Sequence, residues 1–405
     1  MYNTILHFIY FLSNFKFLYP RKYQDWFLQQ KTILSNLRLN DQKSIWIHCS
    51  SLGEYESVKP LISHLKTIHH NITLTFFSAS GYLNFKDYDL IHQVSYLPLD
   101  LKENMTKLIE KINPLLVIIS KNDIWPNMIT LLYKNHTPLY LVGFKLKKRK
   151  VNNWIIKKYY MKYLPKFSFI FCQDNLTAEF LKFNHIPYHS VIGDTRINQV
   201  LSDSQLEFYD NNINSFINNK KVILYGSLEQ SDFDIVINTI NTRKDVKHLI
   251  VPHEISPTII KKLKNNLASK SILYSEIRNS EKIDSNILII NSFGILKHLY
   301  RFSDIAYIGG GFGNGVHNTL EAAVHGNVML FGPKYQDFPE TTLFIKQKIA
   351  TTINHKSEFE KKINNWLENH EQKEVLKNKV FNLVQPKKEN LNLIINQIKK
   401  DLEKK

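Results

Sequence analysis

The chain has 405 residues, too many for one ordinary hydrophobic core, so the sequence predicts two domains. Lys and Arg number 53 against 36 Asp and Glu, and the formal net charge of +17 favours an anionic partner: nucleic acid, an anionic membrane or a phosphorylated substrate. An AT-rich genome, which enriches Asn, Ile and Lys, is an equally good source of this charge. No zinc spacing, RNA-binding motif or basic heptad helix is present, so we expect no nucleic-acid partner. The two cysteines, Cys49 and Cys172, fit no metal or redox spacing.

The N-terminal segment Tyr2–Tyr19 is apolar and aromatic, and no small-residue cleavage site follows it. It is too short and too polar to predict a membrane-spanning helix. Its aromatic side chains stand next to Arg21 and Lys22, which favours a helix over residues 1–20 that associates with an anionic membrane surface. A buried first helix is the alternative.

Strand and helix patterns alternate along the rest of the chain, which is typical of parallel sheets. We expect a first domain over residues 21–200, a polar linker over 201–220, a second domain over 221–385 and a helical tail over 386–405. The first domain is predicted to contain strands Ser44–His48, Thr73–Phe77, Leu115–Ile119, Leu139–Val142, Phe169–Cys172 and Ser190–Ile192, with helices over Gly53–Ile68 and Asn175–Asn184. The second domain is predicted to contain a further series of strands and helices over Val222–Tyr225, Phe233–Thr242, His248–Val251, Pro257–Asn266, Ile287–Ile290, Ile305–Ile308 and Val328–Phe331.

The fold class predicted from this pattern is α/β, with two doubly wound domains. Ligands of open α/β sheets bind at the carboxyl ends of the strands, so we expect a cleft between the two domains. The polar loops of the chain follow predicted strands, which places their side chains at that edge.

A glycine cluster follows the predicted strand Ile305–Ile308 and precedes a helical pattern over His317–His325. Glycine lets the backbone approach a phosphate closely, and the free N–H groups of a first helical turn point at it. We therefore interpret this block as a nucleotide-sugar site, in which Glu321 reaches a ribose hydroxyl. A plain strand-to-helix turn is the alternative. The glycines concerned are Gly309, Gly310, Gly311, Gly313 and Gly315.

Two acidic residues follow strands of the first domain. Glu54 lies in the sequence CSSLGE, between a strand and a helix, where it is a candidate general base or a simple helix cap. Asp123 precedes Pro126 at a helix start, where it orients a substrate or caps the helix.

Further candidates lie in the second domain. Gly226 and Ser227 end a strand and suit a phosphate, whereas His253 is a candidate phosphate or base contact that is as easily structural. Asp232 and Asp234 have the DxD spacing that holds a metal in some glycosyltransferases. They open a helix, so dipole complementation is the favoured interpretation and no metal site is expected.

Taken together, these motifs resemble the 3-deoxy-D-manno-octulosonic acid (Kdo) transferases. The resemblance spans roughly residues 44 to 340 and rests on CSSLGEYESVKPLI, TFFSASGY, YLPLDL, IWPN, VIGDTRIN, VPHEI and GGGFGNGVHNTLEAA followed by LFGPKYQDFPE. The chain departs from the family pattern at His253, where many members have Arg, and at Lys121, where the first acid of an E-x-E is common.

The resemblance implies a GT-B fold of two facing Rossmann-like domains, with the acceptor on the first and the donor nucleotide on the second. It implies an inverting transfer of Kdo from CMP-Kdo, without metal or cofactor, to the 6′-hydroxyl of a tetraacylated disaccharide bisphosphate precursor of lipid A (lipid IVA). It also implies docking at the cytoplasmic face of the inner membrane, either as a peripheral protein or through a single N-terminal anchor. Glu54 takes the place of the catalytic base.

The residues assigned by this resemblance form two sets. The expected donor-binding residues are Gly226, Ser227, Pro252, His253, Gly309, Gly310, Gly311, Gly313, Gly315, His317, Asn318 and Glu321. The expected acceptor-binding residues are Ser50, Ser51, Gly53, Ser78 and Ser80. Another GT-B glycosyltransferase or a sugar-nucleotide epimerase that uses UDP is the second hypothesis, and a non-catalytic peripheral membrane protein is the third.

Overall fold

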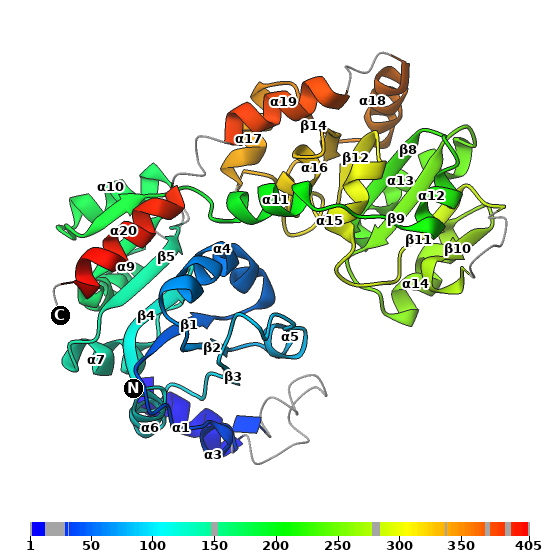
Figure 1. The fold of residues 1–405 in the computed structure, drawn as a ribbon. Helices are drawn as coiled ribbons and strands as arrows, with labels where there is room; N and C mark the ends of the chain where they lie inside the picture. Colours follow the sequence, from blue (N-terminus) through cyan, green and yellow to red (C-terminus); the bar gives the residue numbers. More distant parts are fainter. Residues whose placement is uncertain are drawn as a thin grey trace. The chain divides into compact units, whose positions relative to one another are not determined.

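The computed structural model describes residues 2–12, 29–30, 32–146, 153–277, 284–336, 338–368, 373–384 and 390–403. The chain divides into two compact units. The first comprises Met1–Gln199 and Lys387–Lys405, and the second comprises Val200–Pro386. Each unit is an α/β layer structure built on its own parallel sheet (Figure 1).

The sheet of the first unit has seven parallel strands in the order β3-β2-β1-β4-β5-β6-β7. Its strands are β1 (Ser44–Cys49), β2 (Ile72–Phe76), β3 (Gln93–Tyr96), β4 (Pro114–Ser120), β5 (Leu139–Phe144), β6 (Phe169–Cys172) and β7 (His189–Val191). The chain winds outward from β1 in one direction and from β4 in the other. In sheets of this kind the ligand site lies at the carboxyl edge beside that reversal, here after β1 and β4.

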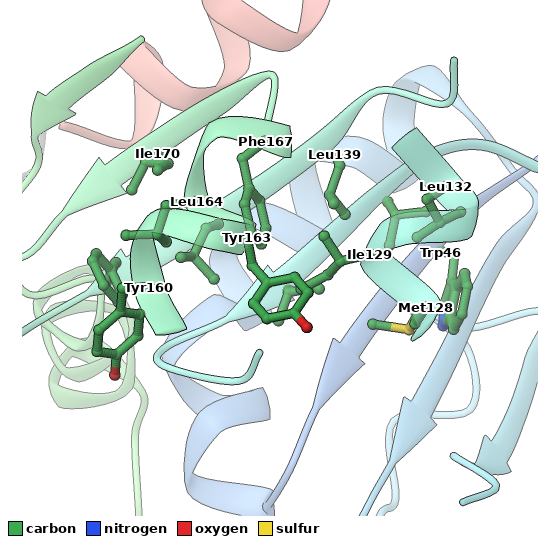
Figure 2. Close-up of a cluster of buried hydrophobic side chains, with 14 of the residues drawn as sticks. Trp46, Met128, Ile129, Leu132, Leu139, Tyr160, Tyr163, Leu164, Phe167 and Ile170 are labelled. Atoms are coloured by element: carbon green, nitrogen blue, oxygen red, sulfur yellow. The ribbon is translucent and has the colours of Figure 1, made fainter. Parts of the chain in front are cut away.

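Helices cover both faces of this sheet, because successive side chains of a strand point to opposite faces. Ile45 and Ile47 pack on the side of α4 and α20, whereas Trp46 packs on the side of α6, α7, α9 and α10. Figure 2 shows the second of these cores, in which Trp46 and Met128 lie in one cluster with Tyr163 and Phe167. The helices of this unit are α1 (Tyr2–Leu12), α3 (Ile33–Asn36), α4 (Leu52–Ile68), α5 (Ala79–Leu83), α6 (Lys102–Ile112), α7 (Pro126–Lys134), α9 (Trp154–Tyr163), α10 (Asn175–Phe183) and α20 (Asn390–Leu402).

The second unit repeats this architecture with a seven-stranded parallel sheet in the order β10-β11-β9-β8-β12-β13-β14. Its strands are β8 (Val222–Leu228), β9 (Lys247–Pro252), β10 (Ser271–Leu273), β11 (Ile287–Ile289), β12 (Ile305–Ile308), β13 (Val328–Phe331) and β14 (Ala350–Thr352). Its helices are α12 (Asn211–Ile217), α13 (Phe233–Thr242), α14 (Pro257–Asn266), α15 (Leu296–Leu299), α16 (Leu320–Ala323), α17 (Pro339–Lys346), α18 (Lys356–Glu368) and α19 (Lys373–Val384). The winding reverses between β8 and β12.

The two segments expected to lie outside the domains belong to them. Residues 201–220, predicted to be a linker, contain the end of α11 (Arg196–Gln205) and α12, whose Ile213 and Phe216 are fully buried. The described part of the tail, α20, packs Ile394, Ile395 and Ile398 into the core beside α4. Its Asp401 accepts a hydrogen bond from the hydroxyl of Tyr140 at 2.9 Å. The polar composition of residues 201–220 gave no helix prediction, since few residues of these helices are buried.

The N-terminal helix α1 is tied to the first unit by Tyr2, whose hydroxyl donates to Asp100 at 2.9 Å. Ile5, Phe8 and Phe11 are more than half exposed on this helix. The remainder of the segment predicted to be membrane-associated, and the basic residues Arg21 and Lys22, lie outside the described residues. Within the described part of the chain, no helix combines the length and apolar character needed to cross a bilayer.

Candidate active site

The loop between β1 and α4 holds Glu54 by two contacts. The hydroxyl of Ser51, the N-cap residue of α4, accepts the N–H of Glu54 at 3.4 Å, and the Glu54 carboxylate accepts the N–H of Ser50 at 2.6 Å. This is close to a capping box, in which the cap and the third helical residue satisfy each other's amides. Glu54 therefore does cap the helix, and the same bond fixes its carboxylate at the carboxyl edge of the sheet.

Asp123 lies beside Glu54, although 69 positions separate them in the sequence. Its carboxylate accepts a hydrogen bond from the hydroxyl of Ser50, the residue whose N–H binds Glu54. Asp123 follows β4 and Ser50 follows β1, and these strands are neighbours in the sheet. Asp123 does not cap α7 with its side chain, because the N-cap position is Trp125 and makes no side-chain cap bond. The structure thus brings two of the predicted acids into one cluster.

His48 lies next to Asp123 and is completely buried. Its Nδ1 atom is 2.9 Å from the hydroxyl of Thr75, which also accepts the indole N–H of Trp46 at 2.9 Å. Its Nε2 atom is buried without a hydrogen-bond partner and lies 3.4 Å from a carboxylate oxygen of Asp123. A proton on Nε2 faces the negative charge of Asp123, so this tautomer suits the site.

The environment of Glu54 makes it a weaker acid than usual. Burial, followed by the charge of Asp123, raises the pKa of the Glu54 carboxyl to about 7, while the N–H of Ser50 and the charge of Lys121 oppose the shift. A general base works best when its pKa lies near the working pH. The site therefore offers a carboxylate that can take up a proton at neutral pH.

A second charged cluster stands next to these carboxylates. The ammonium of Lys121 lies 4.0 Å from Asp194, which forms a close ion pair with Arg196. Although burial raises the pKa of the Asp194 carboxyl, the charges of Arg196 and Lys121 outweigh it and hold that pKa well below its usual range. Lys121 thus places a positive charge beside Glu54, and the ion pair with Asp194 holds the Lys121 side chain in place.

The predicted acceptor residues lie in the loops after β1 and β2 and in the first turns of the helices α4 and α5 that follow them. The N–H of Ser78 donates to the carbonyl of Ser50 at 2.9 Å, which joins the loops. Ser78 caps α5 through Gly81, and its hydroxyl lies 3.0 Å from that of Ser80. Gly53 is exposed, and a Cβ placed there meets nothing within 4 Å. These residues share the edge of the sheet with Glu54.

In the second unit the glycine loop after β12 packs against other backbone segments. A Cβ on Gly309 would lie 2.1 Å from the carbonyl oxygen of Ser227, and one on Gly311 would lie 2.5 Å from the nitrogen of Gly332. Gly310 and Gly315 have φ values of +85° and +135°, which side chains rarely adopt. Glycine is therefore required at these positions by packing and backbone conformation.

Most amides of this loop are already used inside the protein. The N–H of Gly309 donates to Gly226, those of Gly313 and Gly315 donate to Gly310, and that of Gly310 donates to Asp232. Among the described residues, only Gly311 of the five glycines has an N–H without such a partner. The tight turn therefore uses most of the glycine amides within the protein.

The helix after the glycine loop starts later than predicted. The sequence pattern indicated a helix from His317, whereas α16 begins at Leu320. The side-chain carbonyl of Asn318 accepts the N–H of Leu320 at 3.1 Å and so starts the helix there. The amide of Asn318 donates to Glu321 at 2.8 Å. His317 stays in the loop, with its Nε2 atom 2.9 Å from Glu229 and its ring stacked on His253 at 4.4 Å between centroids.

The other predicted donor residues lie along the same edge. Gly226 and Ser227 are inside β8 rather than after it, at a register shift where Ser227 has a φ of +51°. Pro252 is the last residue of β9, and the exposed His253 follows it. A Cβ on Gly226 would lie 2.2 Å from the hydroxyl of Tyr300, so this glycine serves packing.

The two acids of the DxD spacing, Asp232 and Asp234, lie in different environments. Asp232 is buried and accepts hydrogen bonds from the N–H groups of Glu229 and Gly310 and from the hydroxyl of Tyr307, at 2.9 to 3.0 Å. Burial raises the pKa of its carboxyl. Asp234 is exposed in the first turn of α13, so the two carboxylates do not form one site.

Sequence reasoning missed His48, Lys121 as a partner of Glu54, and Glu229. Each lies at or just beyond the end of a strand beside a reversal point, as do the residues that were found. The rule that ligands of open α/β sheets bind at the carboxyl ends of the strands would have included them, had it been applied to every polar residue there.

Comparison with known proteins supports one family. Residues 25–199 match the sequence model of the 3-deoxy-D-manno-octulosonic-acid transferase (kdotransferase) N-terminal domain. The chain is 26% identical to the Kdo transferase of Aquifex aeolicus, over 77% of this chain and 82% of that one, and 25% identical to that of Haemophilus influenzae, over 74% and 72%. It is 28% identical to a bifunctional glycosyltransferase/methyltransferase of Fusobacterium nucleatum, over 90% of this chain but 59% of that protein's length.

Solved structures share the fold at low sequence identity. A UDP-N-acetylglucosamine 2-epimerase homologue from Listeria monocytogenes superposes with a TM-score of 0.63 at 15% identity, covering 90% of this chain and 98% of that one. A glycosyltransferase from Rickettsia africae gives 0.56 at 14% identity, covering 90% and 100%. These likenesses confirm the predicted pair of Rossmann-like α/β units found in GT-B proteins. Residues 25–199 thus match the Kdo transferase family model, and several Kdo transferases are 25–26% identical to this chain over most of its length.

Proposed function

We propose that this protein is a glycosyltransferase that moves Kdo from CMP-Kdo to the 6′-hydroxyl of a tetraacylated disaccharide bisphosphate precursor of lipid A. The family-model match of residues 25–199 supports the reaction class, and the similar proteins named Kdo transferases support the sugar. The observation that carries the proposal is the Glu54 carboxylate, with its pKa raised to about 7 and its position fixed by Ser50.

In the proposed step, Glu54 takes the proton of the acceptor hydroxyl as that oxygen bonds to C2 of the sugar. The bond between C2 and the phosphate oxygen breaks, and CMP leaves with the electron pair. A single displacement inverts the configuration at C2, and proton uptake by Glu54 needs no metal ion. Lys121 stands near the base and is placed to offset negative charge on an anionic acceptor.

The glycine loop of the second unit is the proposed donor site. The N–H of Gly311, the ring of His253 and the side chains of His317 and Asn318 are the groups offered to the phosphate. Glu321 is offered to the ribose, and its carboxylate already accepts from Asn318. The proposal requires that this loop and Glu54 act on the same pair of substrates.

Replacement of the base tests the proposal. Glu54→Gln keeps the size and the Ser50 contact but removes the basicity, so transfer from CMP-Kdo to a lipid A precursor should fall by about 10²–10⁴-fold while CMP binding survives. Glu103→Gln is the matched control, because Glu103 also lies in a first helical turn but is exposed. Near-normal transfer by Glu54→Gln would remove Glu54 from this role.

A different nucleotide-sugar substrate is the second candidate. Glu229 faces the glycine loop, and Asp232 and Glu254 stand nearby, which is an unfavourable setting for the carboxylate of the Kdo sugar. A carboxylate suits hydrogen bonds to hydroxyls of a neutral sugar on UDP. Competition between CMP and UDP for the purified protein separates the candidates: stronger binding of UDP favours the second.

We also propose that α1 docks on the anionic cytoplasmic face of the inner membrane. Ile5, Phe8 and Phe11 give it an exposed apolar surface, while Tyr2 holds it to the first unit through Asp100. Phe8→Asp with Phe11→Asp should reduce sedimentation with phosphatidylglycerol vesicles. Membrane binding without any nucleotide affinity would instead favour the non-catalytic peripheral protein of the third hypothesis.

A further inference from the structure

Three side chains with metal-binding atoms converge at the carboxyl edge of the second unit's sheet. Glu229 comes directly after β8, His253 directly after β9, and His317 from the loop after β12. These three strands are neighbours in the order β9-β8-β12. The fold therefore gathers the three residues from loops that are up to 88 positions apart.

We propose that Glu229, His253 and His317 bind a divalent transition-metal ion of the Zn²⁺ class. One ligand atom from each residue lies within 4.8 Å of the others, and Oε1 of Glu229 lies 2.9 Å from Nε2 of His317. Bonds of about 2.0–2.1 Å to a tetrahedral ion place ligand atoms roughly 3.3 Å apart. A separation at the 4.8 Å limit has to shorten by about 1.5 Å, which rotation of the exposed His253 side chain can supply.

The backbone leaves space for these ligands at two glycines. A Cβ on Gly313 would lie 2.6 Å from a carboxylate oxygen of Glu229, and a Cβ on Gly310 would lie 2.9 Å from Nε2 of His317. Any other residue at these positions would displace a ligand atom. The glycine loop thus shapes the cluster independently of the ligand residues themselves.

The ligand chemistry selects the type of ion. Two imidazoles and one carboxylate suit Zn²⁺, Co²⁺ or Ni²⁺, whereas Mg²⁺ and Ca²⁺ prefer sites made of oxygen atoms. Three protein ligands leave at least one position for water or an oxygen of a small molecule. The inference rests on this geometry and not on the proposed Kdo transfer, for which no ion is required.

Metal titration of the full-length chain tests the proposal directly. The protein is prepared without a histidine tag, stripped with a chelator, and titrated with Co²⁺ alone in buffer without phosphate or nucleotide. We expect one equivalent to bind with the visible absorption of four- or five-coordinate Co²⁺, and Zn²⁺ to displace it. Mg²⁺ should not compete.

Variants assign the site. His253→Ala, His317→Ala and Glu229→Gln should each weaken binding at least about tenfold, since even loss of a group that only supports a ligand has that effect. Gly313→Ala, which removes no ligand, should also weaken it. His355→Ala is the matched control, because His355 is exposed and outside the cluster. Absence of a stoichiometric Co²⁺ spectrum, or equal affinity in all variants, would overturn the proposal. Either result leaves the transfer assay of Glu54→Gln unaffected.

Discussion

The carboxylates of Glu54 and Asp123 are both held by Ser50, the first through its backbone N–H at 2.6 Å and the second through its hydroxyl. One residue therefore sets the separation of two negative charges. Because burial and, after it, the charge of Asp123 raise the pKa of Glu54, the strength of the base depends in part on a residue that follows a different strand.

This coupling predicts the pH dependence of activity. With a Glu54 pKa of about 7, kcat/KM should fall as the pH drops below that value, because the base becomes protonated. Asp123→Asn removes the neighbouring charge, so the acidic limb of the profile should move to lower pH. A pH–rate profile of both proteins measures the shift. An unmoved limb in Asp123→Asn would show that Asp123 does not act on Glu54.

The raised pKa of Glu54 also predicts a stability cost. At pH values between the unfolded pKa of about 4.3 and the folded pKa of about 7, Glu54 keeps a proton in the folded state that it releases in the unfolded state. Stability should therefore fall as the pH rises through this window. Glu54→Gln should stabilise the protein at pH 8 by about 1–3 kcal/mol, with no comparable gain at pH 4, as measured by urea unfolding at both pH values. A loss of stability at pH 8 would contradict the shift.

The buried bonds below the site predict a difference between two threonines of β2. Thr75→Val leaves both the Trp46 indole N–H and the Nδ1 atom of His48 without their partner, at a cost of roughly 2–4 kcal/mol. Thr73→Val removes only one bond, from Asn40, and should cost about half as much. Chemical denaturation of the two variants compares them. Equal losses would mean that the His48 contact adds nothing.

Two glycines in the candidate sites should respond in opposite directions to alanine. Gly311→Ala places a Cβ 2.5 Å from the backbone of Gly332 and should destabilise the second unit by about 1–3 kcal/mol. Gly53→Ala places a Cβ in open space on α4 and should be neutral or stabilising by up to about 1 kcal/mol. Thermal unfolding of both variants tests the contrast. Tolerance of alanine at position 311 would show that the loop can move away from Gly332.

Local sequence patterns predicted the central strands of both sheets. The buried runs that form β1, β4, β5 and β12 were all identified, because central parallel strands are continuous apolar stretches. The edge strands β3, β10 and β14 were missed, since short sequences such as Gln93–Tyr96 and Ala350–Thr352 lack that signal. Glu54 and Asp123 were found for the same reason, as polar residues that follow strong strands.

Features that depend on distant contacts were not predictable in this way. The hydrogen bond of Ser50 to Asp123 joins residues 73 positions apart, and that of Gly310 to Asp232 joins residues 78 apart. The second bond is one of those that occupy the amides of the glycine loop. Only the tertiary structure shows which donors a tight turn has already used.

The packing of α20 has a consequence for biosynthesis. Ile394, Ile395 and Ile398 complete the core beside α4, yet they follow the whole second unit in the sequence. The first unit therefore has to wait, with part of its apolar surface uncovered, until the second unit has been synthesised. The second unit, which is continuous in sequence, is free to mature earlier.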